Sequence, residues 1–228
     1  MVLAEVLSPI TQASLAEIVT ERIREAIIRG ELAPDERITE VEISKVTQVS
    51  RSPVREAFKE LESQGLLVRK EDKCLYVWMP TARDIEEIYS LRCMIEIMVA
   101  ELIIDKIGEE DYRVLEQIIE DSEKAILAED FLEITKLDLR FHDYLVRRTH
   151  HSRLINTWST VMSQWAHLVY CWVKFDEKLA NGVLVDHTLI LDKYRNHDLQ
   201  GLVDLHRQIN IATSRVVKSA LVKKGNNY

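Results

Sequence analysis

Apolar residues recur every three or four positions near the start of this chain. From Leu15 to Ile28 they follow one helix face, and Gly30 comes where such a helix would end. A shorter run over residues 40–46 has the same spacing, with Thr39 as its expected cap. Both runs are therefore predicted to be amphipathic helices.

A third helix is predicted after the three-residue turn 47–49. It begins near Arg51 and runs to about Ser63, with Ser50 as its expected cap. Arg51 and Arg55 are four positions apart, so they share one helix face. Two helices joined by so short a turn match a helix-turn-helix, whose second helix enters the major groove of DNA.

Two short apolar runs, residues 66–68 and 75–78, follow as strands around the polar tip 70–73. Three helices and a hairpin predict a winged helix-turn-helix over residues 15–80. Arginine presents a rigid fork of donors that suits guanine edges and phosphates, and a helix N-terminus also attracts phosphate. The residues expected to contact DNA are Ser50, Arg51, Ser52, Arg55 and Lys73.

Beyond residue 81 the pattern is helical throughout, with hardly a strand signal. Six helices are expected, near 82–106, 109–128, 130–149, 152–175, 183–196 and 198–222, and the expected breaks between them include one at Asn181-Gly182. The chain is thus mainly α, an N-terminal winged helix-turn-helix followed by an all-α six-helix bundle over residues 81–228. Residues 1–14 are expected to be a loosely ordered leader.

Composition and charge fit a globular intracellular protein. Hydrophobic residues make up 46% of the 228 positions and charged residues 30%. No apolar run reaches membrane-spanning length, no signal-peptide layout is present, and three widely spaced cysteines indicate a reducing cytoplasm. The net charge is −8, but residues 44–70 hold six basic and three acidic side chains, a local balance of +3 that favours phosphate contact.

Several polar residues lie on the apolar faces of the expected bundle helices. Asp138 and His142 are one turn apart, and His187 and His206 fall on the apolar lines of the last two helices. Such residues are either a hydrogen-bonded core network or ligands for zinc or a similar divalent metal. Arg92, with Glu96 one turn on, is either half of an internal salt bridge or a holder of a carboxylate.

The N-terminal part resembles the GntR family of bacterial transcription regulators. The resemblance rests on residues 15–17 (LAE), 24–34 (REAIIRGELAP) and 49–57 (VSRSPVREA). Two departures stand out. The family usually has glycine at the position of Gln48, and the wing tip 70–73 lacks the glycines with which members approach the minor groove.

The C-terminal part resembles the all-helical FCD effector domain of the FadR subfamily. The resemblance rests on residues 138–145 (DLRFHDYL), Asp186-His187 and 196–198 (NHD). It implies a divalent metal (zinc, nickel or manganese) held by an aspartate and three histidines, and an arginine at Arg92 that binds an effector carboxylate. Asp138, His142 and His187 match three of the ligands, but the fourth position is Ile209, and His206 is one turn earlier.

These features predict a cytoplasmic homodimer that binds a double-stranded DNA operator and responds to a small carboxylate. The alternative is a metal-dependent enzyme built on the helical bundle, with Glu96 as its general base. The DNA-binding motif has no role in that alternative.

Overall fold

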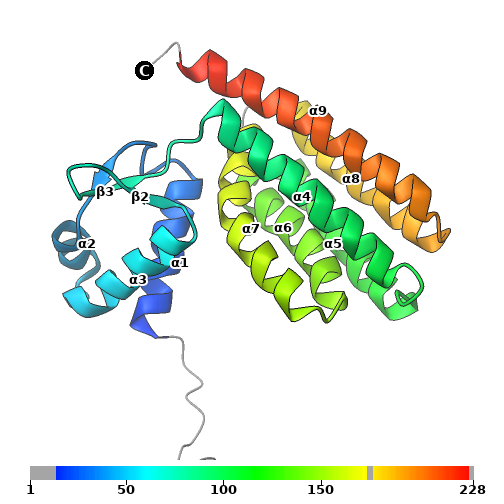
Figure 1. Ribbon diagram of the computed structural model, residues 1–228, viewed down its shortest axis with the longest axis horizontal. Helices are drawn as coiled ribbons and strands as arrows, with labels where there is room; N and C mark the ends of the chain where they lie inside the picture. The colour runs from blue at the N-terminus through cyan, green and yellow to red at the C-terminus, as the bar shows by residue number, and fades with distance from the viewer. Residues whose placement is uncertain (1–13, 174–176, 226–228) are drawn as a thin grey trace, which may run out of the picture.

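The computed structural model describes residues 14–173 and 177–225, which form two bodies side by side (Figure 1). The first has three helices and a small sheet and the second only helices, as the sequence predicts; the expected leader lies outside the described residues except for Ser14. The elements of the first body are α1 (Leu15–Ile28), β1 (Arg37–Ile38), α2 (Glu40–Thr47), α3 (Arg51–Ser63), β2 (Leu67–Arg69) and β3 (Leu75–Val77). Those of the second are α4 (Ala82–Ile103), α5 (Glu109–Leu127), α6 (Phe131–Arg148), α7 (Ser152–Val173), α8 (Glu177–Arg195) and α9 (Leu199–Gly225).

The turn between α2 and α3 bends sharply at Gln48, which has a left-handed backbone with φ of 57°. The GntR family usually has glycine at this position. Glutamine adopts the same left-handed conformation here at a cost of roughly 1–2 kcal/mol. Thr39 caps α2 as predicted, by accepting from the backbone N–H of Glu42. Ser50 is the N-cap residue of α3, but its side chain makes no capping hydrogen bond.

The sheet of the first body has three strands in the order β1-β3-β2, all antiparallel. Strand β1 was not predicted, because two residues are too few to show an alternating pattern. It pairs Arg37 with Tyr76 and so ties the start of α2 to the wing. The core of this body lies between the sheet and the apolar faces of α1 and α3, where Val54, Ala57, Phe58 and Leu61 are buried.

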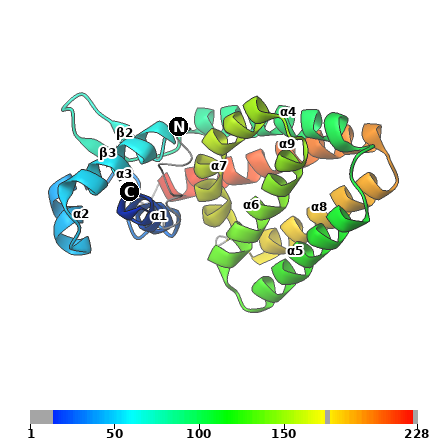
Figure 2. The same cartoon turned by 90° about the horizontal axis from the view of Figure 1, so that it is seen from below.

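The second body is a bundle in which α4 lies along α9 and α6 packs between α5 and α7 (Figure 2). All six helices contribute to one apolar core, in which Trp158, Trp165 and Phe141 are among the largest fully buried side chains. Thr81 and Asp84 form a capping box that starts α4 directly after the wing. Within residues 14–173 and 177–225, no helix is both long and apolar enough to cross a membrane.

One expected boundary in the bundle is wrong. The break predicted at Asn181-Gly182 does not occur, because α8 already begins at Glu177 and continues through Gly182. A glycine inside a helix costs about 1 kcal/mol relative to alanine, which is too little to end a helix that tertiary packing holds. Buried apolar residues lie on both sides of Gly182 in this helix, namely Ala180 and Val183.

Helix α7 forms one contact between the two bodies, beside the ion pair of Lys136 in α6 with Glu25 in α1. The side-chain amide of Gln164 donates to the carbonyl of Gly65 at 3.1 Å, and the hydroxyl of Ser163 donates to the side-chain oxygen of Gln64 at 3.2 Å. Gln64 and Gly65 are the two residues that follow α3. The end of α3 is therefore bound to the middle of α7. A small apolar cluster of Ile28, Ala166 and Tyr170 extends the same contact to α1.

We expect Gly65→Ala to destabilise the protein more than Gly30→Ala does. Both glycines have φ of 70°, a conformation that costs an alanine roughly 1–2 kcal/mol. Only at Gly65 would the new Cβ meet another residue, the Gln164 amide nitrogen at 2.6 Å, and so displace the bond between the two bodies. Chemical denaturation of the two variants measures the difference, and equal losses of unfolding free energy would contradict the contact.

Candidate functional site

The start of α3 presents exposed arginines. Arg51 and Ser52 are exposed, and Arg55 is exposed over 58% of its side chain. Arg55 forms a two-pronged ion pair with Glu40 of α2, with Nε–Oε1 and Nη2–Oε2 distances of 3.0 and 3.1 Å. This bond holds the pKa of Glu40 below its ordinary value. The pair therefore fixes the direction of Arg55 on the outer face of the helix.

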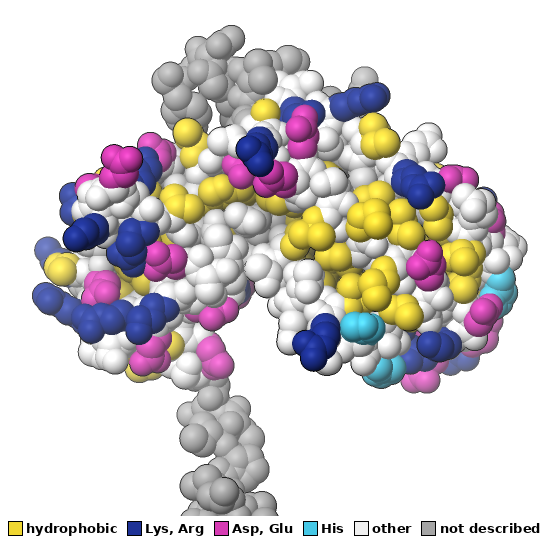
Figure 3. Space-filling model, viewed as in Figure 1, with side chains coloured by type: hydrophobic (Ala, Val, Ile, Leu, Met, Phe, Trp, Pro, Cys, Tyr) yellow, Lys and Arg dark blue, Asp and Glu magenta, His cyan; other side chains and the backbone are white. Residues whose placement is uncertain are grey.

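Most basic residues of the wing form ion pairs within the first body itself. Arg69 makes a two-pronged pair with Glu62, and Lys70 pairs with Asp35 and lies over the ring of Tyr76. Lys73 is exposed at the tip, with a left-handed backbone (φ of 63°). Figure 3 shows Lys and Arg side chains gathered at the end of the molecule that carries this first body.

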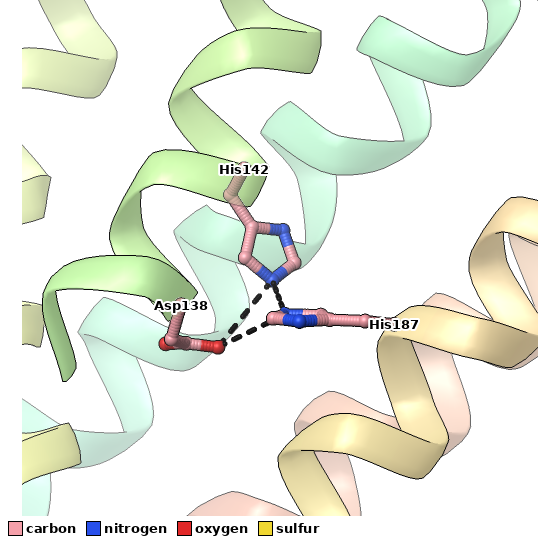
Figure 4. A group of neighbouring side chains, drawn as sticks. All are labelled: Asp138, His142 and His187. Atoms are coloured by element: carbon pink, nitrogen blue, oxygen red, sulfur yellow. Dashed lines mark hydrogen bonds and ion pairs between the residues drawn. The ribbon is translucent and has the colours of Figure 1, made fainter. Parts of the chain in front are cut away.

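In the bundle, the side chains of Asp138 and His142 from α6 meet His187 from α8 (Figure 4). All three are buried. His187 Nε2 lies 3.1 Å from Asp138 Oδ1 and 3.2 Å from His142 Nε2, and the latter is 3.8 Å from the same carboxylate oxygen. The structure thus brings together three of the four residues expected to bind a metal.

Glu96 of α4 orients His142 through the ring nitrogen that is not among the candidate ligand atoms. Its carboxylate lies 2.8 Å from His142 Nδ1 and accepts from Arg92 Nε and Asn210 Nδ2, both at 2.9 Å. A carboxylate at Nδ1 fixes the proton of the His142 ring on that nitrogen. His142 Nε2 therefore has the free lone pair of the ring, and this atom lies beside Asp138 and His187.

Arg92 meets the first of the two expectations that the sequence left open, the internal salt bridge, and its role as the holder of a carboxylate stays a prediction. It pairs with Glu96 as a buried salt bridge, and it also faces the candidate site, where its Nη2 lies 3.0 Å from His142 Nε2. Its guanidinium lies over the ring of Trp165, 3.8 Å from the centroid. The arginine is held on three sides by α4, α6 and α7.

His206 is not brought into the group of Asp138, His142 and His187. Its Nδ1 instead lies 3.4 Å from Glu96 Oε2, and its Nε2 is buried without a hydrogen-bond partner. The side chain lines a cavity together with Asp138, His142 and His187, but on α9 it lies one helical turn before Ile209, the position that matches the fourth ligand.

Three residues of the site were missed at the sequence level. Trp165 repeats with Trp158 at seven-residue spacing, which indicated packing alone. Asn210 is adjacent to the apolar line of α9 and gave no signal. Asp186 precedes His187 and borders the cavity, where burial raises its pKa to about 6.

The protonation states suit metal ligands. Burial, together with the nearby Arg92, lowers the pKa of His142 to about 4, so its ring is neutral at neutral pH. Burial alone would raise the pKa of Asp138, but His187, His142 and Arg92 outweigh it and hold that pKa below its ordinary value. A neutral imidazole and an ionised carboxylate are the forms that bind divalent ions.

The spacing of the three ligand atoms also fits an ion. A tetrahedral zinc ion about 2.0–2.1 Å from each nitrogen places its ligands roughly 3.3 Å apart. The observed separations of 3.1, 3.2 and 3.8 Å bracket that value. Asp138 Oδ2 and His187 Nδ1, which are not among these three atoms, are buried without a hydrogen-bond partner, so the protein leaves part of the hydrogen-bonding capacity of this group unused.

The cavity at these residues is small. The space open to the centre of a water molecule is about 20 Å³, enough for roughly one water. Its lining combines Arg92, Asp138, His142 and His187 with apolar walls from Val183 and Ile190. A ligand larger than an ion or a water therefore requires these side chains to move.

Comparison with known proteins assigns both bodies. Residues 15–77 match the family of bacterial regulatory proteins described as the gntR family, and residues 87–210 match the FCD domain. The uncharacterized HTH-type transcriptional regulator YdhC of Bacillus subtilis is 39% identical over 137 residues, which are 59% of this chain and 61% of that protein. The gluconate operon transcriptional repressor of the same organism is 28% identical over 229 residues, covering 96% of this chain and 93% of the repressor.

Two solved structures have the same fold. McbR/YncC of E. coli superposes with a TM-score of 0.78 at 18% identity, covering 91% of this chain and 99% of the other. A GntR regulator from Rhodococcus sp. RHA1 gives 0.76 at 22% identity, covering 90% and 98%.

We expect Arg51→Ala and Arg55→Ala each to weaken binding to operator DNA. A two-pronged contact to a base contributes on the order of 1–3 kcal/mol, so each loss should reduce affinity about fivefold or more. Fluorescence anisotropy with the protein's own upstream DNA measures this, with Arg140→Ala on the exposed side of α6 as a charge-matched control. Unchanged affinity in both variants, with folding intact, would remove α3 from the DNA interface.

Proposed function

Since this chain belongs to the GntR family of bacterial regulatory proteins and is a DNA-binding transcription regulator with an FCD domain, we propose that a small carboxylate bound in its helical bundle controls operator binding. The observation that carries the proposal is the buried Arg92, which faces a cavity lined by Asp138, His142 and His187. The Nε of this side chain already bonds to Glu96, but its Nη2 end faces a neutral imidazole and can accept an anionic partner.

Glu96 bonds to only one edge of the Arg92 guanidinium. It takes the Nε edge of the guanidinium, and Nη2 faces a neutral imidazole, which is a weaker acceptor than a carboxylate. A small acid entering the cavity would provide the stronger acceptor. Sugar acids, hydroxy-acids and diacids fit this chemistry, because their further oxygens suit a metal and the polar wall at Asp186. The name of the gluconate operon repressor, a relative along most of its length, favours the sugar acids.

We further propose that Asp138, His142 and His187 hold one divalent ion, such as zinc, nickel or manganese. The ion would supply a positive charge for the effector carboxylate, and the effector or water would complete its coordination. Ile209 offers no ligand, so we expect weaker binding than at a site with four protein ligands. Glu96 would orient His142 and would not contact the ion.

A homodimer in the cytoplasm is the proposed working form, since two recognition helices read the half-sites of a pseudo-palindromic operator. An exposed apolar stripe on α4 supports it. Leu91, Met94 and Met98 are spaced along one face of that helix, with exposed fractions of 44%, 64% and 38%. Figure 3 shows hydrophobic side chains gathered on this side of the bundle. Contiguous exposed apolar surface of this kind favours a protein partner. We propose repression, which is also the role that the gluconate operon relative has by its name.

The alternative of a metal-dependent enzyme is not supported. The matched families and relatives are transcription regulators. Glu96, the general base that such an enzyme would need, is buried and accepts from three side chains. Arg92, His142 and His206 outweigh its burial and hold its pKa well below the ordinary value, so it is a poor proton acceptor.

A panel of small carboxylates should raise the thermal midpoint of the purified protein, and neutral or cationic analogues should not. The screen is run with and without chelator, because in chelator-treated protein Arg92 alone attracts the acid. Arg92→Ala should abolish the response in chelator, whereas Arg140→Ala should leave it unchanged. If Arg92→Ala retains the full response, Arg92 serves only as the salt-bridge partner of Glu96.

Purified protein should carry about one divalent ion per chain, or take one up with a rise in thermal midpoint. His142→Ala should abolish uptake, because it removes one of only three proposed protein ligands. His197→Ala is the matched control, since that histidine is exposed between α8 and α9. Elemental analysis without an ion, and no stabilisation by zinc, nickel or manganese, would leave these residues as a hydrogen-bonded core network.

A further inference from the structure

A single nitrogen atom carries two roles in the bundle. His142 Nε2 is one of the three candidate ligand atoms, 3.2 Å from His187 Nε2. It is also 3.0 Å from Arg92 Nη2. Guanidinium nitrogens only donate, so the imidazole nitrogen is the acceptor in this contact. Because His142 Nδ1 is held by Glu96, Nε2 has the only free lone pair of the ring.

One lone pair cannot accept a hydrogen bond from arginine and bind a metal ion at the same time. We propose that Arg92 is a built-in competitor of the divalent ion, so that metal uptake requires its Nη2 to leave His142. The inference rests on the proposed metal site of Asp138, His142 and His187. In addition to that site, it assigns Arg92 the role of lowering its affinity for the metal ion.

The surroundings of Arg92 allow such a movement at one end only. The Nε edge is bonded to Glu96 at 2.9 Å, and the plane lies over Trp165, so the side chain is tethered near its base. The Nη2 end points into the cavity and contacts His142. A carboxylate in the cavity would be a stronger acceptor for that end than the neutral imidazole. An acid that takes Arg92 thereby frees the lone pair for the ion.

Titration with zinc alone tests the competition without any organic ligand. Chelator-stripped wild-type protein, Arg92→Ala and Arg140→Ala are titrated against a chromophoric zinc chelator. We expect zinc affinity to rise by roughly tenfold or more in Arg92→Ala, because a hydrogen bond from a charged donor no longer opposes binding. Arg140→Ala removes the same charge from the exposed face of the same bundle and should leave the affinity unchanged.

A second variant protects the test against misfolding, since Arg92→Ala leaves Glu96 buried beside fewer donors. The double variant Arg92→Met with Glu96→Gln removes both charges and keeps an acceptor for His142 Nδ1. It should also bind zinc more tightly than wild type, and adding His142→Ala should abolish the gain.

Each result decides between the two proposals. Equal or weaker zinc binding in both Arg92 variants overturns the competition, while the metal site itself stands. Absence of zinc binding in all variants overturns the metal site and the competition with it.

Discussion

The buried carboxylate of Glu96 is the constraint on which the arrangement of the bundle site depends. It is the common acceptor for Arg92, His142 and Asn210, which come from α4, α6 and α9. A buried carboxylate is tolerated only when several donors compensate its lost hydration. The same donors are thereby fixed in place, so the charge that is costly to bury determines the directions of the imidazole and the guanidinium.

Helix α7 connects that site to the DNA-binding body. Trp165 supports Arg92, and the two preceding residues, Ser163 and Gln164, bond to the end of α3. One turn of a rigid helix therefore touches both the proposed effector site and the helix that carries Arg51 and Arg55. Suppose that a ligand binds more tightly to one position of α7 than to another. It would then favour the matching position of the DNA-binding body and change operator affinity, and operator DNA would change ligand affinity by the same factor.

The sequence predicted the long elements well, because helical periodicity persists over many residues in α1, α3 and the bundle. It failed where the deciding contacts are tertiary. Strand β1 exists because Arg37 pairs with Tyr76, and α8 continues through Gly182 because its neighbours are buried. Neither cause is visible in a local pattern.

For the candidate site, the sequence likewise predicted which residues lie on the inner helix faces but not how their side chains bond to one another. Helix spacing placed Asp138, His142, His187 and Arg92 on apolar helix faces, and the resemblance to the FCD domain added their expected roles as metal ligands and carboxylate holder. It could not give the proton position on His142, nor the contact between Arg92 and that ring, since both depend on side chains from three helices. Asn210 escaped notice because its partner, Glu96, is distant in sequence.

The central claim is that the acid site in the bundle and the DNA site are energetically coupled. Operator affinity, measured by fluorescence anisotropy with and without a saturating concentration of the most stabilising acid, tests it most directly. The account predicts a change of about fivefold or more, matched by an equal change in acid affinity when operator is bound. An acid that binds with clear stabilisation yet leaves operator affinity unchanged would contradict the account.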